Sequence, residues 1–283
     1  MDIKTPKICD YCSGQSSSLI TVENNYPIVR CNTCGLIYVG QHPPERDGKV
    51  IGEYYVGGEA ERTYKAYERV NTFLAETITR YFPAKGAFLD VGCGYGHLIS
   101  MMVDRGWSGH GSELSQLAVD YVNRKFGKDV VQYGDIPALS FSDESFTAIN
   151  LTNVLEHVPS PTRTLLDCRN LLKQDGALFI RVPNMDFSFA FSRIYRLMNL
   201  FGLKFNSYSL IAWQPPFHLT GFNSRTLVKF LQKTEFDVLY VGPSTLTAGK
   251  GYYVAEILAK LLYTVTLRTI NLCPTLLCVA KKR

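Results

Sequence analysis

Four cysteines near the start of the chain have a spacing that suits a metal ion. They form two C-x2-C pairs, Cys9 with Cys12 and Cys31 with Cys34. A tight turn within each pair aims both sulfurs at one point, and two such pairs are typical of structural zinc sites, whereas a redox dithiol normally comes singly. Four thiolates leave no open position for water. We therefore predict a zinc ion that holds structure and takes no part in catalysis.

A second candidate for chemistry is the acid–imidazole pair Glu156 and His157, which adjoin one another in NVLEHVPSP. Histidine is the side chain best suited to take a proton near neutral pH. The pair also begins a helical pattern, so the alternative is that both residues only cap or hydrogen-bond the start of a helix. Of the two, we expect Glu156 to orient or cap, and we predict His157 as the catalytic base.

Composition limits the protein class that positions these residues. The 283 residues are 46% hydrophobic and 19% charged, with a net charge of +5, a composition typical of a globular enzyme with one sizeable core. The sequence shows no secretory signal and no unbroken apolar run of membrane-spanning length, which predicts a cytoplasmic protein. Because the charge is modest and no dense basic run is present, nucleic acid is an unfavoured partner.

The chain divides into three predicted parts. Residues 1–42 hold the cysteine pairs between short strand patterns and are predicted to form a zinc ribbon. Residues 43–82 read as a linker followed by an amphipathic lead-in helix, which Pro83 ends. Residues 83–283 alternate strands and helices, which predicts an α/β fold with a mostly parallel sheet and helices on both faces.

Ligands of such sheets bind at the carboxyl ends of the strands. The first such end is LDVGCGYG, where Gly92, Gly94 and Gly96 let the backbone pass close beneath a ligand. Asp90 stands just before these glycines. A carboxylate there would repel a phosphate, so the loop favours the cationic end of an amino acid.

Acids also follow the next two predicted strands. Glu113 in HGSELS is placed to accept hydrogen bonds from both hydroxyls of a ribose, and Asp135 in YGDI from the exocyclic amine of a purine. Either acid alone could instead be a helix cap or a solvated loop residue. A ligand with an amine, a ribose and an adenine but no phosphate is S-adenosylmethionine, which we predict as the cofactor.

From about residue 60 to its end, the chain resembles the class I S-adenosylmethionine-dependent methyltransferases. The resemblance rests on LDVGCGYG, GSELS, GDI, NVLEHVPSP, LLKQDGALFIRVPN and HLTGFNSRTLVKFLQ, in the family's usual order. With the cysteine pairs, it is similar to bacterial enzymes of sugar and natural-product pathways that carry an N-terminal zinc ribbon. It implies a Rossmann-like, seven-stranded sheet, with the glycine loop at the methionine part of the cofactor, Asp90 at its amino group, Glu113 at the ribose and Asp135 at the adenine.

The acceptor pocket is expected in an insertion at residues 185–222. There we predict Trp213 and His218 as pocket walls, with Tyr54 and Tyr55 of the linker closing over the site. The expected acceptor is a small hydroxylated molecule, a sugar or sugar-nucleotide. Two alternatives stay open, an RNA base methyltransferase whose ribbon binds nucleic acid and a catalytically silent cofactor-binding scaffold.

Two helix predictions bear on the surroundings of the site. Residues 162–176 are predicted as a helix that ends at a glycine cap, Gly176. Residues 252–272 carry a wide apolar stripe, which we expect to pack on the sheet or on a second subunit, with contact to a membrane surface as the alternative.

Overall fold

The structure is a computed structural model of the chain, and it describes six stretches of residues. They are 8–41, 59–190, 215, 217–244, 250–266 and 271–283. The predicted substrate residues Tyr54, Tyr55 and Trp213, and most of the predicted insertion, lie outside these stretches.

A seven-stranded sheet with the order β10-β11-β8-β7-β4-β5-β6 forms the centre of the molecule. The five strands from β8 to β6 run parallel, and β11 is antiparallel to both of its neighbours. The predicted mostly parallel, seven-stranded sheet is therefore confirmed. The strands are β4 (Ala87–Val91), β5 (Ser108–Glu113), β6 (Val131–Tyr133), β7 (Phe146–Thr152), β8 (Leu172–Pro183), β10 (Phe236–Pro243) and β11 (Thr275–Lys282).

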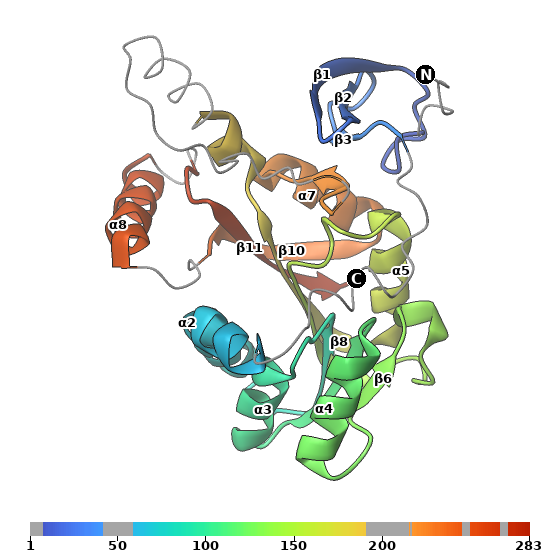
Figure 1. The fold of residues 1–283 in the computed structure, drawn as a ribbon, viewed down its shortest axis with the longest axis vertical. Helices are drawn as coiled ribbons and strands as arrows, with labels where there is room; N and C mark the ends of the chain where they lie inside the picture. The colour runs from blue at the N-terminus through green and yellow to red at the C-terminus, as the bar shows by residue number, and fades with distance from the viewer. Residues whose placement is uncertain (1–7, 42–58, 191–214, 216, 245–249, 267–270) are drawn as a thin grey trace.

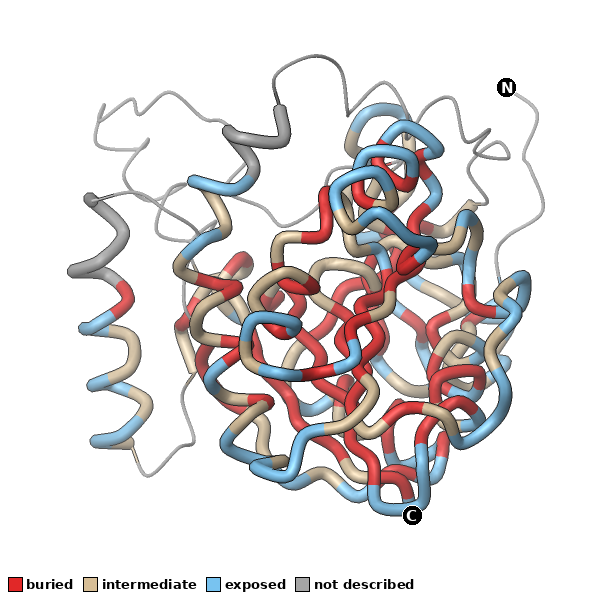
Figure 2. The backbone as a smooth tube through the Cα atoms, turned by 90° about the horizontal axis from the view of Figure 1, so that it is seen from below, coloured by how far each residue is buried: buried red, intermediate tan, exposed pale blue. Residues whose placement is uncertain are grey.

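Helices cover both faces of this sheet, with α2 and α3 on one face and α5 and α7 on the other (Figure 1). Because neighbouring strand residues point to opposite faces, Leu178 and Ile180 of β8 pack toward α5 and α7, while Phe179 packs toward α2 and α3. Buried residues accordingly concentrate in the central strands (Figure 2). The helices are α2 (Glu59–Tyr81), α3 (His97–Asp104), α4 (Gln116–Phe126), the short 3-10 helix η2 (Ile136–Ala138), α5 (Pro161–Leu171), α7 (Ser224–Lys233) and α8 (Lys250–Val265).

Helix α5 is shorter than predicted, and Gly176 is not its cap. The helix ends at Leu171, and Leu172 is already extended and begins β8 by pairing with Phe146. Pairing with β7 thus overrides the helical pattern of the intervening residues. A Cβ on Gly176 would lie 3.0 Å from the carbonyl oxygen of Phe146, so close strand packing explains this glycine.

Helix α8 does not pack its apolar stripe on the sheet, so that part of the prediction is wrong, while packing on a second subunit stays a prediction. Leu258, Leu261 and Val265 are 59%, 57% and 71% exposed. The side of α8 that faces the protein carries Glu256, which is buried and pairs with Arg69 of α2 at 3.0 Å. The stripe is therefore turned outward, on a helix that stands at the edge of the molecule (Figure 1). Among the helices that the structure describes, none is both long and apolar enough to cross a membrane.

The predicted ribbon forms a second, four-stranded antiparallel sheet with the order β1-β2-β3-β9. Its fourth strand, β9 (Thr220–Gly221), comes from the region predicted as the substrate insertion. Residues that lie far apart in the sequence therefore share one sheet. The other strands are β1 (Ser17–Glu23), β2 (Tyr26–Cys31) and β3 (Ile37–Val39).

The ribbon is also fixed to the main domain by side chains. Asp10 accepts hydrogen bonds from Ser160 Oγ at 2.6 Å and from the backbone N–H of Thr162 at 2.8 Å, at the start of α5. The ring of Tyr11 packs on that of Phe230 in α7, with centroids 5.1 Å apart. Cysteine-bearing turns and the large sheet consequently contribute to one continuous core.

Candidate functional site

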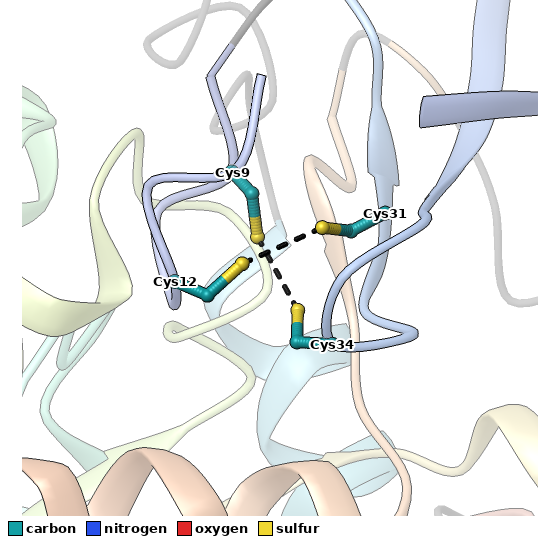
Figure 3. A group of neighbouring side chains, drawn as sticks. All are labelled: Cys9, Cys12, Cys31 and Cys34. Atoms are coloured by element: carbon teal, nitrogen blue, oxygen red, sulfur yellow. Dashed lines mark hydrogen bonds between the residues drawn. The ribbon is translucent and has the colours of Figure 1, made fainter. Parts of the chain in front are cut away.

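The four predicted zinc ligands converge in the ribbon (Figure 3). Sγ of Cys9 lies 3.6 Å from Sγ of Cys34, Sγ of Cys12 lies 3.5 Å from Sγ of Cys31, and all four sulfurs lie within 4.8 Å of one another. In a tetrahedral site with Zn–S bonds of about 2.3 Å, neighbouring sulfurs are about 3.8 Å apart. The four side chains therefore fit a zinc ion.

Two matching backbone turns produce this convergence. The N–H of Ser13 donates to the carbonyl oxygen of Cys9 at 2.8 Å, and that of Gly35 donates to Cys31 at 3.0 Å. Ser13 and Gly35 have positive φ angles of 58° and 80°, a backbone shape that small and polar residues tolerate best. A Cβ on Gly14 would lie only 3.2 Å from Sγ of Cys31, so this glycine leaves room for the sulfurs.

The thiols differ in how readily they ionise. Burial raises the pKa of Cys9 and brings that of Cys34 to about 11. Burial also opposes ionisation of Cys31, but the backbone N–H groups of Cys34 and Thr33 hold its pKa at about 7. Because zinc binds thiolates, metal loading at neutral pH would release protons from this site.

The glycine loop follows β4, as predicted, and its glycines are required by the backbone. Gly92, Gly94 and Gly96 have φ angles of 66°, 52° and 66°. A Cβ on Gly92 would lie 2.8 Å from Val154 Cγ2, and one on Gly96 would lie 2.9 Å from Val122 Cγ1. The first contact is informative, because it seats the segment after β7, which carries the acid–imidazole pair, directly against the glycine loop.

Asp90 lies at the carboxyl end of β4 and is 5% exposed. Its Oδ1 accepts a hydrogen bond of 2.7 Å from Nδ2 of Asn150 on β7, and Thr152 Oγ1 donates to the amide oxygen of Asn150 at 2.9 Å. Burial raises the pKa of Asp90 to about 7, and the nearby carboxylate of Glu113 adds to this rise. A cation placed beside Asp90 would lower that pKa again.

Glu113 has a role in the structure that its position in the sequence did not indicate. Its Oε2 accepts from the N–H of Gly94 at 2.8 Å, and its Oε1 accepts from the N–H groups of Leu114 and Ser115 at 2.7 and 3.0 Å. The carboxylate thus ties the glycine loop to the turn before α4. Asp135, by contrast, is exposed after β6 and makes no side-chain bond to η2.

The acid–imidazole pair is joined by His218, so three ligating side chains come together. Nδ1 of His157 lies 2.8 Å from the carbonyl oxygen of Phe217, to which it donates, and its ring centroid lies 4.7 Å from that of His218. Nε2 of His157 is 3.9 Å from Oε1 of Glu156. One ligating atom from each of Glu156, His157 and His218 lies within 4.8 Å of the others. We call these three residues the EHH cluster.

Glu156 does not cap α5, so the capping part of that expectation is wrong, while an orienting role stays a prediction. The cap of α5 is Ser160, whose Oγ accepts from the N–H of Arg163 at 3.2 Å. The Glu156 carboxyl is buried, and among the described residues neither of its oxygens has a hydrogen-bond partner. Burial raises its pKa to about 8, and the charge of Arg181 opposes part of this rise.

The N-terminal ribbon, the sheet of β1, β2, β3 and β9, holds His218 in this place. The backbone oxygen of Glu156 accepts from the N–H of Leu219 at 2.7 Å, and the oxygen of Leu219 accepts from the N–H of Val39 in β3 at 2.9 Å. Tyr38 of β3 is paired with Thr220. The residue after His218 is therefore fixed on one side by the EHH cluster and on the other by the ribbon, which gives the ribbon a partner within its own chain.

Arg181 of β8 is a buried charged residue that was not predicted from the sequence, and it is only 2% exposed. Its Nη1 donates to Asn153 Oδ1 at 2.8 Å, and its Nε donates to Ser244 Oγ at 3.2 Å. Asn153 follows β7 with a φ of 54°, so Arg181 fixes the strained start of the loop that leads to Glu156. The available signal was a single charge within the apolar run ALFIRVP.

Comparison with known proteins identifies a family over most of this fold. Residues 63–241, more than half of the chain, match the family described as methyltransferase domain. Two similar curated proteins are ubiquinone biosynthesis O-methyltransferases. That of Coxiella burnetii is 30% identical over 128 residues, 44% of this chain and 55% of the relative. That of Pseudomonas paraeruginosa is 34% identical over 132 residues, which are 44% of this chain and 57% of the relative. The match thus spans little more than half the length of these relatives.

Solved structures share the fold at low identity. A Methanosarcina mazei S-adenosylmethionine-dependent methyltransferase has a TM-score of 0.52 at 19% identity and covers 73% of this chain and 96% of its own. A second structure is the 1,6-didemethyltoxoflavin-N1-methyltransferase of Burkholderia thailandensis, solved with 1,6-didemethyltoxoflavin and S-adenosylhomocysteine. It has a TM-score of 0.54 at 13% identity, and the match covers 94% of this chain and 99% of that protein. The predicted Rossmann-like methyltransferase fold is therefore confirmed.

Proposed function

Because the chain belongs to the methyltransferase-domain family, we propose that it transfers a methyl group from S-adenosylmethionine to an oxygen of a small hydroxylated acceptor. One observation above all supports this proposal. The contact between the glycine loop and Val154 puts the EHH cluster at the edge of the sheet where a cofactor of this family binds.

The cofactor residues proposed from sequence fit this placement. Asp90 would meet the amino group, the loop of Gly92, Gly94 and Gly96 the methionine part, Glu113 the ribose and Asp135 the adenine. Support comes from chemistry, since a buried carboxyl with a raised pKa gains most from a cationic partner. Both Glu113 oxygens already accept backbone N–H groups, which would hold the carboxylate in a fixed direction for the ribose.

S-adenosylmethionine supplies a methyl group on a positively charged sulfur, and transfer to oxygen leaves a neutral thioether. The chain must align the acceptor oxygen, keep water out and receive or release the hydroxyl proton. His157 is the residue we propose for the proton. Because its Nδ1–H is held by the Phe217 carbonyl, the lone pair of the neutral ring is on Nε2, the nitrogen that faces Glu156.

The zinc ion proposed for Cys9, Cys12, Cys31 and Cys34 would have a structural task. Those sulfurs fill a tetrahedral ligand set, so no position is left for an acceptor. Its contribution is to hold β3, which in turn pairs with β9 next to His218.

The proposal is more specific about the acceptor than the comparisons with known proteins are. Both curated relatives are named O-methyltransferases of ubiquinone biosynthesis, which favours oxygen as the methylated atom. A sugar or sugar-nucleotide stays a prediction from the resemblance of the zinc-ribbon sequence. None of the relatives described above is named for a sugar.

The test is a screen with methyl-labelled S-adenosylmethionine and two acceptor panels, nucleotide sugars and ring compounds with adjacent hydroxyls. We expect label on an acceptor oxygen with the wild-type protein, and loss of at least about 99% of turnover in His157→Ala, the scale of proton-transfer catalysis. His110→Gln, a half-buried histidine whose ring packs on Phe141 and Phe146, is the matched control. Failure to bind S-adenosylmethionine would refute the proposal and leave a scaffold role.

A further inference from the structure

We propose that the EHH cluster binds a divalent first-row transition-metal ion that also contacts the acceptor. This inference rests on the proposed function, and it assigns a second metal site distinct from the zinc of the ribbon. It replaces direct proton acceptance by His157, because one lone pair on Nε2 serves either a proton or a metal.

The ligand set is the first argument. Two imidazoles and one carboxylate are donors that ions such as Mn²⁺, Fe²⁺ and Zn²⁺ accept together. The ligating atoms of Glu156, His157 and His218 lie within 4.8 Å of one another. Opposite ligands of an octahedral ion with bonds of about 2.1 Å are about 4.2 Å apart. Small rotations of the two imidazoles, which are only partly buried, would close the cluster around an ion.

The buried carboxyl of Glu156 is the second, independent argument. It is 2% exposed, and neither oxygen has a hydrogen-bond partner among the described residues. A buried carboxylate without partners is costly, and an ion is one of the few groups that would satisfy both oxygens. Arg181, the cation whose charge reaches Glu156, is committed to Asn153 and Ser244.

The hydrogen bond behind His157 is the third argument. Metal-ligating histidines usually donate their second ring N–H to a carbonyl or carboxylate, which fixes the ring and its tautomer. His157 Nδ1 has this contact, at 2.8 Å to the Phe217 carbonyl oxygen. Because Phe217 directly precedes His218, the same short segment supplies one ligand and orients another.

Three protein ligands leave positions open on an octahedral ion, and those positions suit one or two acceptor oxygens. The ion would lower the pKa of an acceptor hydroxyl. The O–H bond breaks with its proton passing to water, an O–C bond forms to the methyl carbon, and the C–S bond breaks with its electron pair left on sulfur. An acceptor with two neighbouring oxygens would be held best, because both can reach the ion.

The experiment is a titration with Mn²⁺ of zinc-loaded protein that holds one zinc per chain, the amount that the four thiolates bind, and electron paramagnetic resonance counts the free Mn²⁺. Mn²⁺ is a hard ion that does not displace zinc from thiolates, and zinc content is measured alongside. We expect one Mn²⁺ per chain. Affinity should fall at least about tenfold in His218→Ala and in Glu156→Gln, the lower end of what even outer partners of a metal contribute. Glu76→Gln, an exposed acid on α2, and His110→Gln should bind as the wild type does.

Misfolding would be recognised by loss of zinc or of S-adenosylmethionine binding, and Glu156→Gln, which removes only a charge, should keep both. Equal Mn²⁺ binding by wild type and Glu156→Gln, or no stoichiometric binding by the wild type, would overturn the inference. Labelled methyl transfer by zinc-loaded protein without added Mn²⁺ separates the two proposals. Full activity there would sustain the methyltransferase and remove the metal, whereas bound Mn²⁺ without cofactor binding would do the reverse.

Discussion

Replacing Asp90 by asparagine should stabilise the cofactor-free protein at high pH. The Asp90 carboxyl has a pKa of about 7 in the fold, because it is buried, against 3.8 for an ordinary aspartate. A raised acid pKa means that the folded state holds the proton more tightly than the unfolded chain. This tighter proton binding stabilises the folded state below about pH 4, and the stabilisation is lost as the pH rises through about 7.

The difference of about three pKa units corresponds to roughly 4 kcal/mol of unfolding free energy. Most of it is lost between pH 4 and 7, and about 2.5 kcal/mol falls between pH 5 and pH 8 by proton linkage. Asparagine keeps an oxygen that can accept from Asn150. The advantage of Asp90→Asn over the wild type should therefore grow by about 2.5 kcal/mol from pH 5 to pH 8.

Urea unfolding of both proteins at pH 5, 6, 7 and 8, without cofactor, measures this difference directly. Taking the difference between the two proteins cancels the titration of all other groups. A stability gap that stays constant across this range would refute the reasoning, since it would mean that Asp90 ionises normally in the fold.

Three further changes have outcomes that follow from the described contacts. Cys12→Ser should abolish zinc retention, measured by elemental analysis, and should suppress methyl transfer because β9 loses its partner strand; activity at the wild-type level would contradict the structural link. Gly92→Ala should cost about 1–2 kcal/mol through its positive φ and weaken S-adenosylmethionine binding, since its Cβ would lie 2.8 Å from Val154 Cγ2; calorimetry showing unchanged affinity would argue against the loop. Ser160→Ala should lower the unfolding free energy by about 1–2 kcal/mol through the lost α5 cap, and its effect should be non-additive with Asp10→Ala, which a double-mutant cycle tests.

Local patterns were sufficient for most of the fold. The alternation of strands and helices predicted for residues 83–283 includes β4 and β7, and the lead-in helix predicted before Pro83 became α2. Such elements are predictable because alternating or 3.6-residue spacing of apolar side chains decides which face is buried. The start of β8 was not predictable in this way, because Leu172 is extended only through its pairing with Phe146 on another strand.

The site was predictable where it depends on short motifs and not where distant segments meet. The Cys9–Cys12 and Cys31–Cys34 spacing leads directly to four converging sulfurs. No local signal places His218 beside His157, because 60 residues separate them and the contact depends on β9 pairing with the ribbon. Local sequence also could not predict that the apolar stripe of α8 faces outward, because the pairing of Glu256 with Arg69 of α2 decides which side of the helix faces the protein.

The most direct test of the central claim, a cofactor at the glycine loop, is calorimetric titration of zinc-loaded protein with S-adenosylmethionine at pH 8. The account predicts one cofactor per chain, with affinity reduced at least about tenfold in Asp90→Asn, the usual scale for a lost charge-assisted hydrogen bond. Absence of binding, or equal affinity in the variant, would contradict it.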